Sequence, residues 1–160
     1  MDPSPRRTAR PIPASIWTSA AALLVAVVAQ TLLVAGQEAK ARPGWDRVAF
    51  AGLVAVLVLG GLLARRRLAW LWGHYLALLL GALTAFSLGV QLWRGWPLLH
   101  ETTLYMASSA FGLAVASAAL GRRSAMAYFD LVCPACLAPS RMGNDFLFRE
   151  ARCRACGNVW

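Results

Sequence analysis

Four long stretches of this sequence are almost free of charged residues, and each is long enough to cross a lipid bilayer as a helix. Their approximate boundaries are 14–35, 45–64, 68–93 and 97–121. A helix needs roughly 20 apolar residues to span about 30 Å of hydrocarbon. We therefore predict an all-α membrane protein, with residues 14–121 forming four transmembrane helices in an antiparallel bundle.

Composition disfavours the other classes of chain. The sequence is 59% hydrophobic and 14% charged, whereas a soluble domain has about 25% charged residues. Disordered chains are poor in hydrophobic residues, and a soluble helical bundle needs a polar face on every helix, which these stretches lack. Tryptophans also lie near the predicted helix ends, where amphipathic rings favour the headgroup zone; they are Trp45, Trp70, Trp72, Trp93 and Trp96.

Arginine and lysine predict the orientation, because they are enriched on the cytoplasmic side of membrane proteins. The chain has 16 Lys and Arg against 7 Asp and Glu, a formal charge of +9. One side of the predicted bundle collects eight arginines, namely Arg6, Arg7, Arg10, Arg65, Arg66, Arg67, Arg122 and Arg123. The other side has four basic residues, namely Lys40, Arg42, Arg47 and Arg94. We expect a multi-pass protein of the cell (inner or plasma) membrane with both termini in the cytoplasm.

The N-terminal region allows two interpretations. Residues 1–13 are rich in Pro and Arg and predict a disordered basic arm. The stretch at 14–35 that follows is either an uncleaved helix or a signal peptide. Its apolar core exceeds the 7–15 residues usual for a signal peptide, which favours the uncleaved helix.

All four cysteines lie in the polar C-terminal segment, in two C-x-x-C pairs. Cys133 and Cys136 form the first pair, and Cys153 and Cys156 form the second after sixteen residues. The two-residue gap lets one tight turn present two sulfurs to a single ion, and two such pairs predict a tetrahedral four-thiolate site. Gly157 can adopt the left-handed conformation that closes the second turn, whereas Leu137 stands at the matching position of the first.

Residues 128–160 resemble the zinc-ribbon class on the basis of these two pairs. The resemblance implies two metal-binding turns on β-hairpins around one structural zinc, with Cys133, Cys136, Cys153 and Cys156 as ligands. A turn signal at 143–145 and a strand candidate at 146–148 lie between the pairs. We expect residues 122–160 to form a small cytosolic β zinc ribbon.

Three other uses of the cysteines stay open. Disulfides would need an oxidising compartment, which conflicts with the predicted cytoplasmic tail. A rubredoxin-like iron centre uses the same four ligands, so Fe is the alternative metal. A dithiol redox site would be expected in the outward loops, which contain no cysteine. Structural zinc is favoured, and because four sulfurs fill its coordination sphere, the ion would fold the tail without catalysing a reaction.

The tail is a weak candidate for binding nucleic acid. Residues 122–160 contain six arginines and three acidic residues, and a Zn²⁺ held by four thiolates adds about two negative charges. Phosphate binding takes several clustered cations. We therefore expect contacts with a protein or with lipid headgroups instead.

The predicted spans contain few candidate functional residues. His74, His100 and Glu101 are possible polar sites, but the two histidines belong near opposite leaflets and cannot share one ligand. Small residues recur every four positions on the third span and form a predicted helix-packing face, either within the bundle or against another protein or copy. This face consists of Gly73, Ala77, Gly81, Ala85 and Gly89. Polar residues expected to hydrogen-bond between helices are Gln30, Thr84, Ser87, Gln91, Tyr105, Ser108 and Ser109.

The leading functional hypothesis is a non-enzymatic accessory, scaffold or assembly subunit whose ribbon docks a partner protein. Its expected partners are the lipid bilayer and a protein or second copy of the chain; no small-molecule substrate is indicated. A small transporter or channel component is the alternative, with a polar path lined by residues such as Gln30, Thr84, Ser87, Gln91 and Ser108. A membrane redox protein that uses the four-cysteine centre is the third hypothesis.

Overall fold

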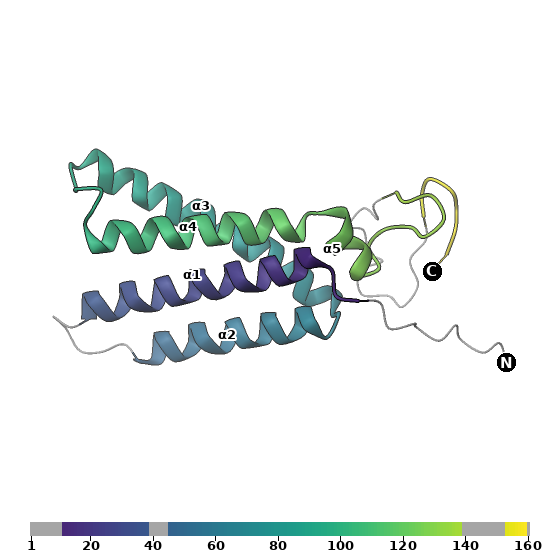
Figure 1. Ribbon diagram of the computed structural model, residues 1–160, viewed down its shortest axis with the longest axis horizontal. Helices are drawn as coiled ribbons and strands as arrows, with labels where there is room; N and C mark the ends of the chain where they lie inside the picture. Colours follow the sequence, from purple (N-terminus) through teal and green to yellow (C-terminus); the bar gives the residue numbers. More distant parts are fainter. Residues whose placement is uncertain (1–10, 39–44, 139–152, 160) are drawn as a thin grey trace.

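The protein is mostly helical, and a computed structural model describes its residues 11–38, 45–138 and 153–159. Four long helices lie lengthwise beside one another, and a short fifth helix follows at one end (Figure 1). The first residues of α1, the helix α5 and the C-terminal cysteine segment all lie at this same end. The described residues contain no sheet. The helices are α1 (Ala14–Glu38), α2 (Trp45–Leu63), α3 (Arg67–Trp93), α4 (Glu101–Leu120) and α5 (Arg123–Tyr128).

The start of one helix differs from the sequence-based expectation, and one helix was not expected. The predicted helix at 97–121 begins only at Glu101, because Pro97 starts a turn and His100 caps the helix by accepting a hydrogen bond from the Thr102 N–H at 3.3 Å. The expected polar segment after residue 121 begins with α5, which the sequence analysis missed. Most of the predicted basic arm at 1–13, the turn at 143–145 and the strand at 146–148 lie outside the described residues.

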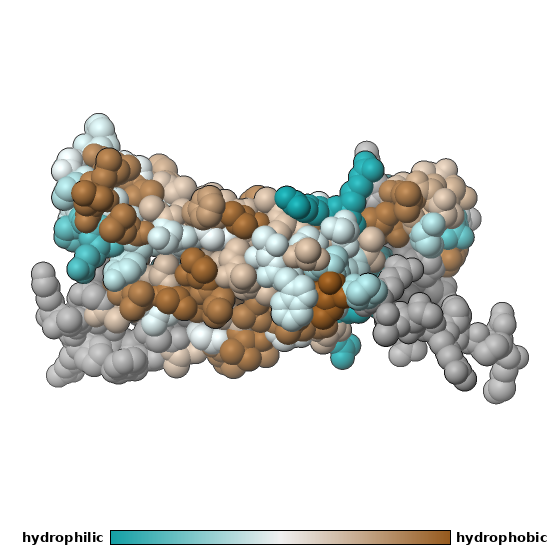
Figure 2. Space-filling view, viewed as in Figure 1, coloured by the Kyte–Doolittle hydropathy of each residue, from teal (hydrophilic) through white to brown (hydrophobic). Residues whose placement is uncertain are grey.

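The exterior of the helices is apolar. Hydrophobic side chains cover the middle of the face shown in Figure 2, and hydrophilic residues gather toward its ends. Three helices, α1, α3 and α4, are long and apolar enough to cross a membrane. Within α2, the stretch Gly52–Leu63 is apolar but shorter than a span, so among the described residues three of the four predicted spans meet this criterion. A surface of this kind belongs in hydrocarbon, which indicates a membrane protein.

Small residues let α1 and α4 approach each other closely. A Cβ atom added to Gly112 on α4 would lie 2.8 Å from the backbone oxygen of Ala22 and 3.3 Å from the Cβ of Ala26, both on α1. Ser19 and Ala29 on α1 are buried as well. Without bulky side chains between them the two backbones come into direct contact, which gains dispersion energy in a membrane.

One predicted hydrogen bond between helices is confirmed, and two others form within a helix instead. Gln30 Nε2 on α1 donates to Ser109 Oγ on α4 at 2.9 Å. The hydroxyls of Thr84 and Ser87 donate to carbonyl oxygens four residues earlier, at 2.7 and 2.9 Å. Both hydroxyls find an acceptor within their own helix, because the carbonyl oxygen four residues earlier is within hydrogen-bonding distance.

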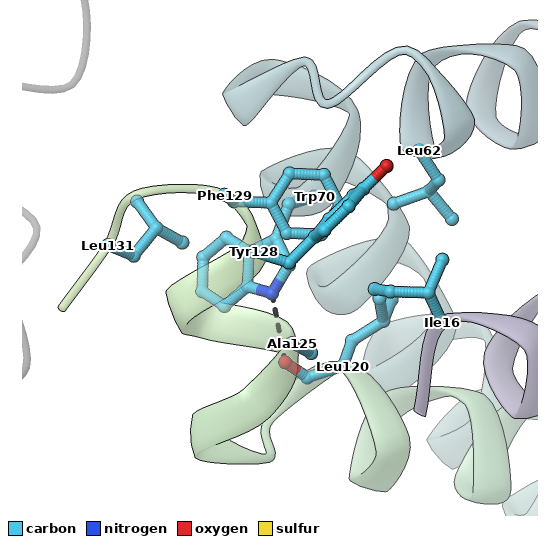
Figure 3. Packing of buried hydrophobic residues seen from close by; sticks show 8 residues of the cluster. All are labelled: Ile16, Leu62, Trp70, Leu120, Ala125, Tyr128, Phe129 and Leu131. Carbon is cyan, nitrogen blue, oxygen red and sulfur yellow. Dashed lines mark hydrogen bonds between the residues drawn. The ribbon is translucent and has the colours of Figure 1, made fainter. Parts of the chain in front are cut away.

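A buried cluster joins the helices at the end that carries α5 (Figure 3). Trp70 on α3 donates its indole N–H to the Leu120 carbonyl oxygen at the end of α4, at 2.9 Å. Phe129, just after α5, is 1% exposed. The cluster consists of Ile16, Leu62, Trp70, Leu120, Ala125, Tyr128, Phe129 and Leu131. Because it draws on all five helices and on the segment before the first cysteine, it holds that segment against the bundle.

Candidate metal centre

The two cysteine pairs form turns with the same backbone pattern. In the first turn, Cys133 N–H donates to the Ala138 oxygen at 3.0 Å, and Leu137 N–H donates to the Cys133 oxygen at 2.9 Å. In the second turn, the matching bonds join Cys153 to Asn158 at 2.7 Å and Gly157 to Cys153 at 2.8 Å. Each C-x-x-C pair therefore folds into a tight turn that presents both of its sulfurs on one side.

The fifth position of each turn has left-handed backbone. Gly157 has φ +73°, as its role in the second turn requires, and Leu137 has φ +57° at the equivalent place. A side chain with a Cβ costs about 1 kcal/mol in this conformation. Leu137 is 67% exposed, so burial of its side chain does not offset that cost.

The four sulfurs lie within 4.8 Å of one another. Across the two turns, Cys133 Sγ is 3.6 Å from Cys156 Sγ, and Cys136 Sγ is 3.4 Å from Cys153 Sγ. A tetrahedral ion with metal–sulfur bonds of about 2.3 Å needs sulfurs about 3.8 Å apart. The predicted ligands are therefore close enough together to hold one metal ion, and the site is consistent with a zinc-ribbon-like centre.

One cysteine of each turn is buried and the other is exposed. Cys133 and Cys153, the first of each pair, are buried, while Cys136 and Cys156 face outward. The buried Cys133 follows Leu131, a member of the buried cluster, by two residues. The cysteine centre thus has a buried side, formed by Cys133 and Cys153, and a side open to the surroundings, formed by Cys136 and Cys156.

The protonation of the cysteines differs between the buried and exposed positions. Burial tends to raise the pKa of the Cys133 thiol, but backbone N–H donors at Cys136 and Ala135 outweigh it and lower that pKa to about 6. The pKa of Cys153 is also lowered, chiefly by the N–H of Cys156. The Ala138 N–H donates to Cys136, but the three neighbouring cysteines outweigh it and raise the Cys136 pKa to about 12. Four adjacent thiolates repel one another, and the positive charge of a divalent cation would offset this repulsion.

The structure places His74 apart from the two other predicted polar sites, His100 and Glu101. His74 Nδ1 lies 3.1 Å from the Ser117 oxygen and 3.3 Å from Ser117 Oγ on α4, and its ring stacks on Trp70. His100 and Glu101 lie at the opposite end of the bundle, at the start of α4. His74 thus contacts the α3–α4 interface, and His100 acts as a helix cap.

The predicted small-residue face of α3 divides into two halves. Gly73, Ala77 and Gly81 are buried, and a Cβ added to Gly81 would lie 3.2 Å from Leu113 Cβ on α4. Ala85 and Gly89 are exposed, and a Cβ on Gly89 would meet no atom within 4 Å. The half nearer α5 packs within the bundle, whereas the far half faces the surroundings.

A cavity of about 530 Å³ lies between α1, α2 and α3. Of the residues proposed for a polar path, Gln30 and Thr84 contribute to its wall. Leucine, valine and alanine make up most of the remaining lining, as in Leu23, Val58 and Ala77. The wall of this cavity is accordingly mostly apolar.

Sequence analysis missed two sets of contacts that hold the helices and α5 together. One is the small-residue row on α1, whose spacing of four and three residues was visible in the sequence; it comprises Ser15, Ser19, Ala22, Ala26 and Ala29. The other is a set of contacts between the α2–α3 turn and the end of α5, made by Arg65 and Arg67 with Tyr128 and Asp130. No sequence signal indicates this second feature.

Among the described residues, the cysteine centre is the feature that points most directly to a function. Its donor set and spacing are consistent with metal binding, and its position places it at the end of a bundle with an apolar exterior. In comparisons with known proteins, no protein-family model, no curated protein sequence and no solved structure matches this chain.

Proposed function

We propose that this protein is a non-enzymatic accessory or scaffold subunit of the cell membrane, with a structural zinc ion in its four-cysteine centre. The metal-organised tail would dock a cytoplasmic partner protein. The observation that carries the proposal is the cross-turn spacing of the sulfurs, 3.4 and 3.6 Å, at a site two residues after a segment that is buried against the helices.

Zinc fits the proposed role because four thiolates complete its tetrahedral coordination. With no open position, the ion would stabilise the two turns and bind no substrate. The tail would occupy the reducing cytoplasm, where cysteines remain thiols or metal ligands rather than disulfides. Iron is the alternative ion for the same donors.

In the proposed topology α1, α2, α3 and α4 all cross the bilayer, and both ends of the chain face the cytoplasm. The start of α1, the α2–α3 turn and the cysteine turns share one end of the bundle, which supports an even number of crossings. The arginines of that end, including the exposed Arg66, Arg122 and Arg123, support its placement on the cytoplasmic side.

The docking role draws support from the outward side of the two turns. Pro134, Ala135 and Leu137 of the first turn are exposed, and Val159 follows the second turn with its side chain exposed. Leu137 keeps an exposed apolar side chain in a conformation that favours glycine. Backbone strain of this sort persists where a residue has a function, and contact with a partner protein would supply one.

Metal analysis tests the first half of the proposal. The purified full-length protein should contain one zinc per chain, and a Cys133→Ser, Cys153→Ser double variant should contain almost none. Arg154→Ala is the matched control, because Arg154 is an exposed residue inside the second turn and offers no ligand. Equal zinc contents in the double variant and the wild type would contradict the proposed centre.

Acid titration gives an independent check on the ligands. Metal binding requires thiolates, so protons compete with zinc. Bound zinc should be retained at neutral pH and released in acid, because protons then displace the metal from the thiolates. Zinc whose retention does not depend on pH, or that leaves at neutral pH, would argue against thiolate ligands.

Crosslinking in native membranes tests the docking role. The wild type should form a specific crosslinked complex with a cytoplasmic protein, and both the double cysteine variant and Leu137→Asp should lose it. Arg154→Ala again serves as the control. A wild type that stays a free monomer under these conditions would contradict a scaffold role.

A further inference from the structure

The α2–α3 turn contacts the segment that leads into the first cysteine turn. Arg65 Nε donates to the Tyr128 carbonyl oxygen at 3.0 Å, and Arg65 Nη2 lies 3.5 Å from both carboxylate oxygens of Asp130. The Arg65 guanidinium also lies 4.9 Å from the centre of the Tyr128 ring. A residue of the turn between two membrane helices thus binds the end of α5 through three kinds of contact.

Two further residues extend this set of contacts. Arg67 donates to the Phe129 oxygen at 3.3 Å and to the Asp130 backbone oxygen at 3.4 Å. In the reverse direction, the Tyr128 hydroxyl donates to the Leu63 oxygen at the end of α2, at 3.2 Å. The last carbonyls of a helix have no partners within the helix, so each helix end supplies donors to the other. We call Arg65, Arg67, Tyr128 and Asp130 the arginine joint.

Both helix ends in the arginine joint close with the same backbone motif. Arg66 N–H donates to the Gly61 oxygen at 2.9 Å after α2, and Leu131 N–H donates to the Met126 oxygen at 2.9 Å after α5. The residue before each donor is left-handed, Arg65 with φ +54° and Asp130 with φ +56°. This position usually holds glycine.

The end of α3 provides the comparison within the same chain. Its turn has the equivalent bond from Trp96 N–H to the Gln91 oxygen at 3.2 Å, and its left-handed residue is Gly95 with φ +81°. At the two helix ends that face each other, charged residues stand in place of glycine, and these two residues form the ion pair. The left-handed backbone of Arg65 and Asp130 is thus found where their side chains make contacts that glycine could not make.

The arginine joint is directly connected to the metal centre. Asp130 precedes Cys133 by three residues, and between them Leu131 is buried in the cluster that includes Leu62 and Trp70. Cys133 is itself fully buried. Only two residues separate Asp130 of the joint from Cys133, so the joint and the metal centre are linked by a short stretch of chain that is partly buried.

We infer that metal binding at the cysteine turns is coupled to the packing of the α2–α3 turn through the arginine joint. The bound ion stabilises the joint, and the joint raises the affinity for the ion; the two effects are equal by thermodynamic linkage. Metal loading then controls the conformation of the membrane domain at this end of the bundle. This inference rests on the proposed metal binding.

Zinc affinity of the full-length protein in detergent, measured by competition with a chromophoric chelator, tests one direction of the coupling. Arg65→Gly and Asp130→Gly should each weaken zinc binding about 5- to 10-fold, although glycine relieves the backbone strain at both positions. The double variant should be no weaker than Arg65→Gly alone, because Arg65→Gly already removes the ion pair with Asp130. The control is Arg66→Ala, which removes an equal charge from an exposed neighbour and should bind zinc like the wild type.

Hydrogen exchange tests the other direction on the wild-type protein. Removal of zinc by a chelator should speed exchange in peptides covering the α2–α3 turn at 63–67, while the α3–α4 turn at 94–100 stays unchanged. Asp130→Asn, which preserves the shape of the side chain, should show the faster exchange at 63–67 even with zinc bound.

The outcomes separate the inference from the proposed function. If the wild type binds zinc but Arg65→Gly binds it equally well, or zinc removal leaves exchange at 63–67 unchanged, the coupling is wrong and the metal centre stands. If the wild type binds no metal, both the proposed centre and the coupling are wrong.

Discussion

The two ends of the helical bundle differ in how the helices are packed. At the end that carries the cysteine turns, a single buried cluster includes side chains from all five helices, and Phe129 is 1% exposed. At the opposite end, Trp93 is 88% exposed and Leu99 is 86% exposed. The two halves of the small-residue row on α3 follow the same division, since Gly73 is buried and Gly89 is open.

This difference shows that the hydrophobicity of a residue does not by itself decide whether its side chain is buried in the bundle or exposed on its surface. Hydrophobic side chains in a membrane protein can face lipid as readily as another helix, because hydrocarbon surrounds both. Burial therefore depends on what lies opposite. At the cysteine end, α5 and the segment that follows it supply the opposing surface, and this is where the tail joins the helices.

Truncation of a phenylalanine at each end should give the largest contrast. Phe129→Ala removes a fully buried ring and should lower the free energy of unfolding by about 3 kcal/mol. Phe86→Ala on α3, where the ring is 72% exposed, should change it little. Denaturant unfolding in mild detergent measures both, and equal losses would contradict the difference in packing.

Enlarging a glycine at each end should give the next largest contrast. A Cβ added to Gly73 would lie 3.3 Å from Val58 Cγ1 and 3.4 Å from Leu120 Cδ1. Gly73→Leu should therefore push α2 and α4 away and lower the free energy of unfolding by about 2 kcal/mol. Gly89→Leu meets no neighbouring atom and should be neutral. Thermal unfolding of the two variants side by side provides the measurement. A destabilised Gly89→Leu variant would reveal a helix packed on the far half of α3, such as one from a second copy.

Replacing a tryptophan at each end tests a single hydrogen bond. Trp70→Phe leaves the buried Leu120 oxygen without its indole donor and should cost about 1.5 kcal/mol. The highly exposed Trp93 is the matched control, and Trp93→Phe should leave the unfolding midpoint unchanged. If the two variants unfold alike, the indole bond contributes nothing to the packing of the cysteine end.

The smallest expected effect concerns the two cysteine turns themselves. Leu137→Gly should stabilise the zinc-loaded tail by about 0.5 kcal/mol, since relief of the left-handed strain exceeds the added freedom of glycine when unfolded. Gly157→Leu should have the opposite effect. Chelator-dependent unfolding compares the two. Destabilisation by Leu137→Gly would mean that this side chain packs on part of the protein.

Features that depend on neighbouring residues could be predicted from the sequence. The C-x-x-C gaps placed two sulfurs in each turn, Gly157 was expected to be left-handed, and the apolar lengths of α1, α3 and α4 were sufficient for a span. Each follows from spacing or composition along a short segment. The late start of α4 was missed because the His100 cap depends on a side-chain conformation that apolar length does not reveal.

Features that depend on distant residues could not be predicted in this way. Thr84 and Ser87 offered the same polar groups as Gln30, yet only Gln30 reaches Ser109 across a helix interface. Whether a polar side chain bonds within its own helix or to a neighbouring helix depends on how the helix is rotated about its axis. That rotation is set by the packing of the helices, not by the residue itself.

The sequence by itself determined that this chain has apolar helices of membrane-spanning length and two cysteine turns that can bind metal, because hydropathy and ligand spacing are local properties. Only the tertiary structure decided that the turns face each other with sulfurs 3.4 and 3.6 Å apart, that half of the α3 row is buried, and that Arg65 meets Asp130. The contact between Arg65 and Asp130 joins residues 65 positions apart. Both residues have a left-handed backbone, which is unfavourable for a residue with a side chain. Such contacts depend on how several helices pack together, which no single segment determines.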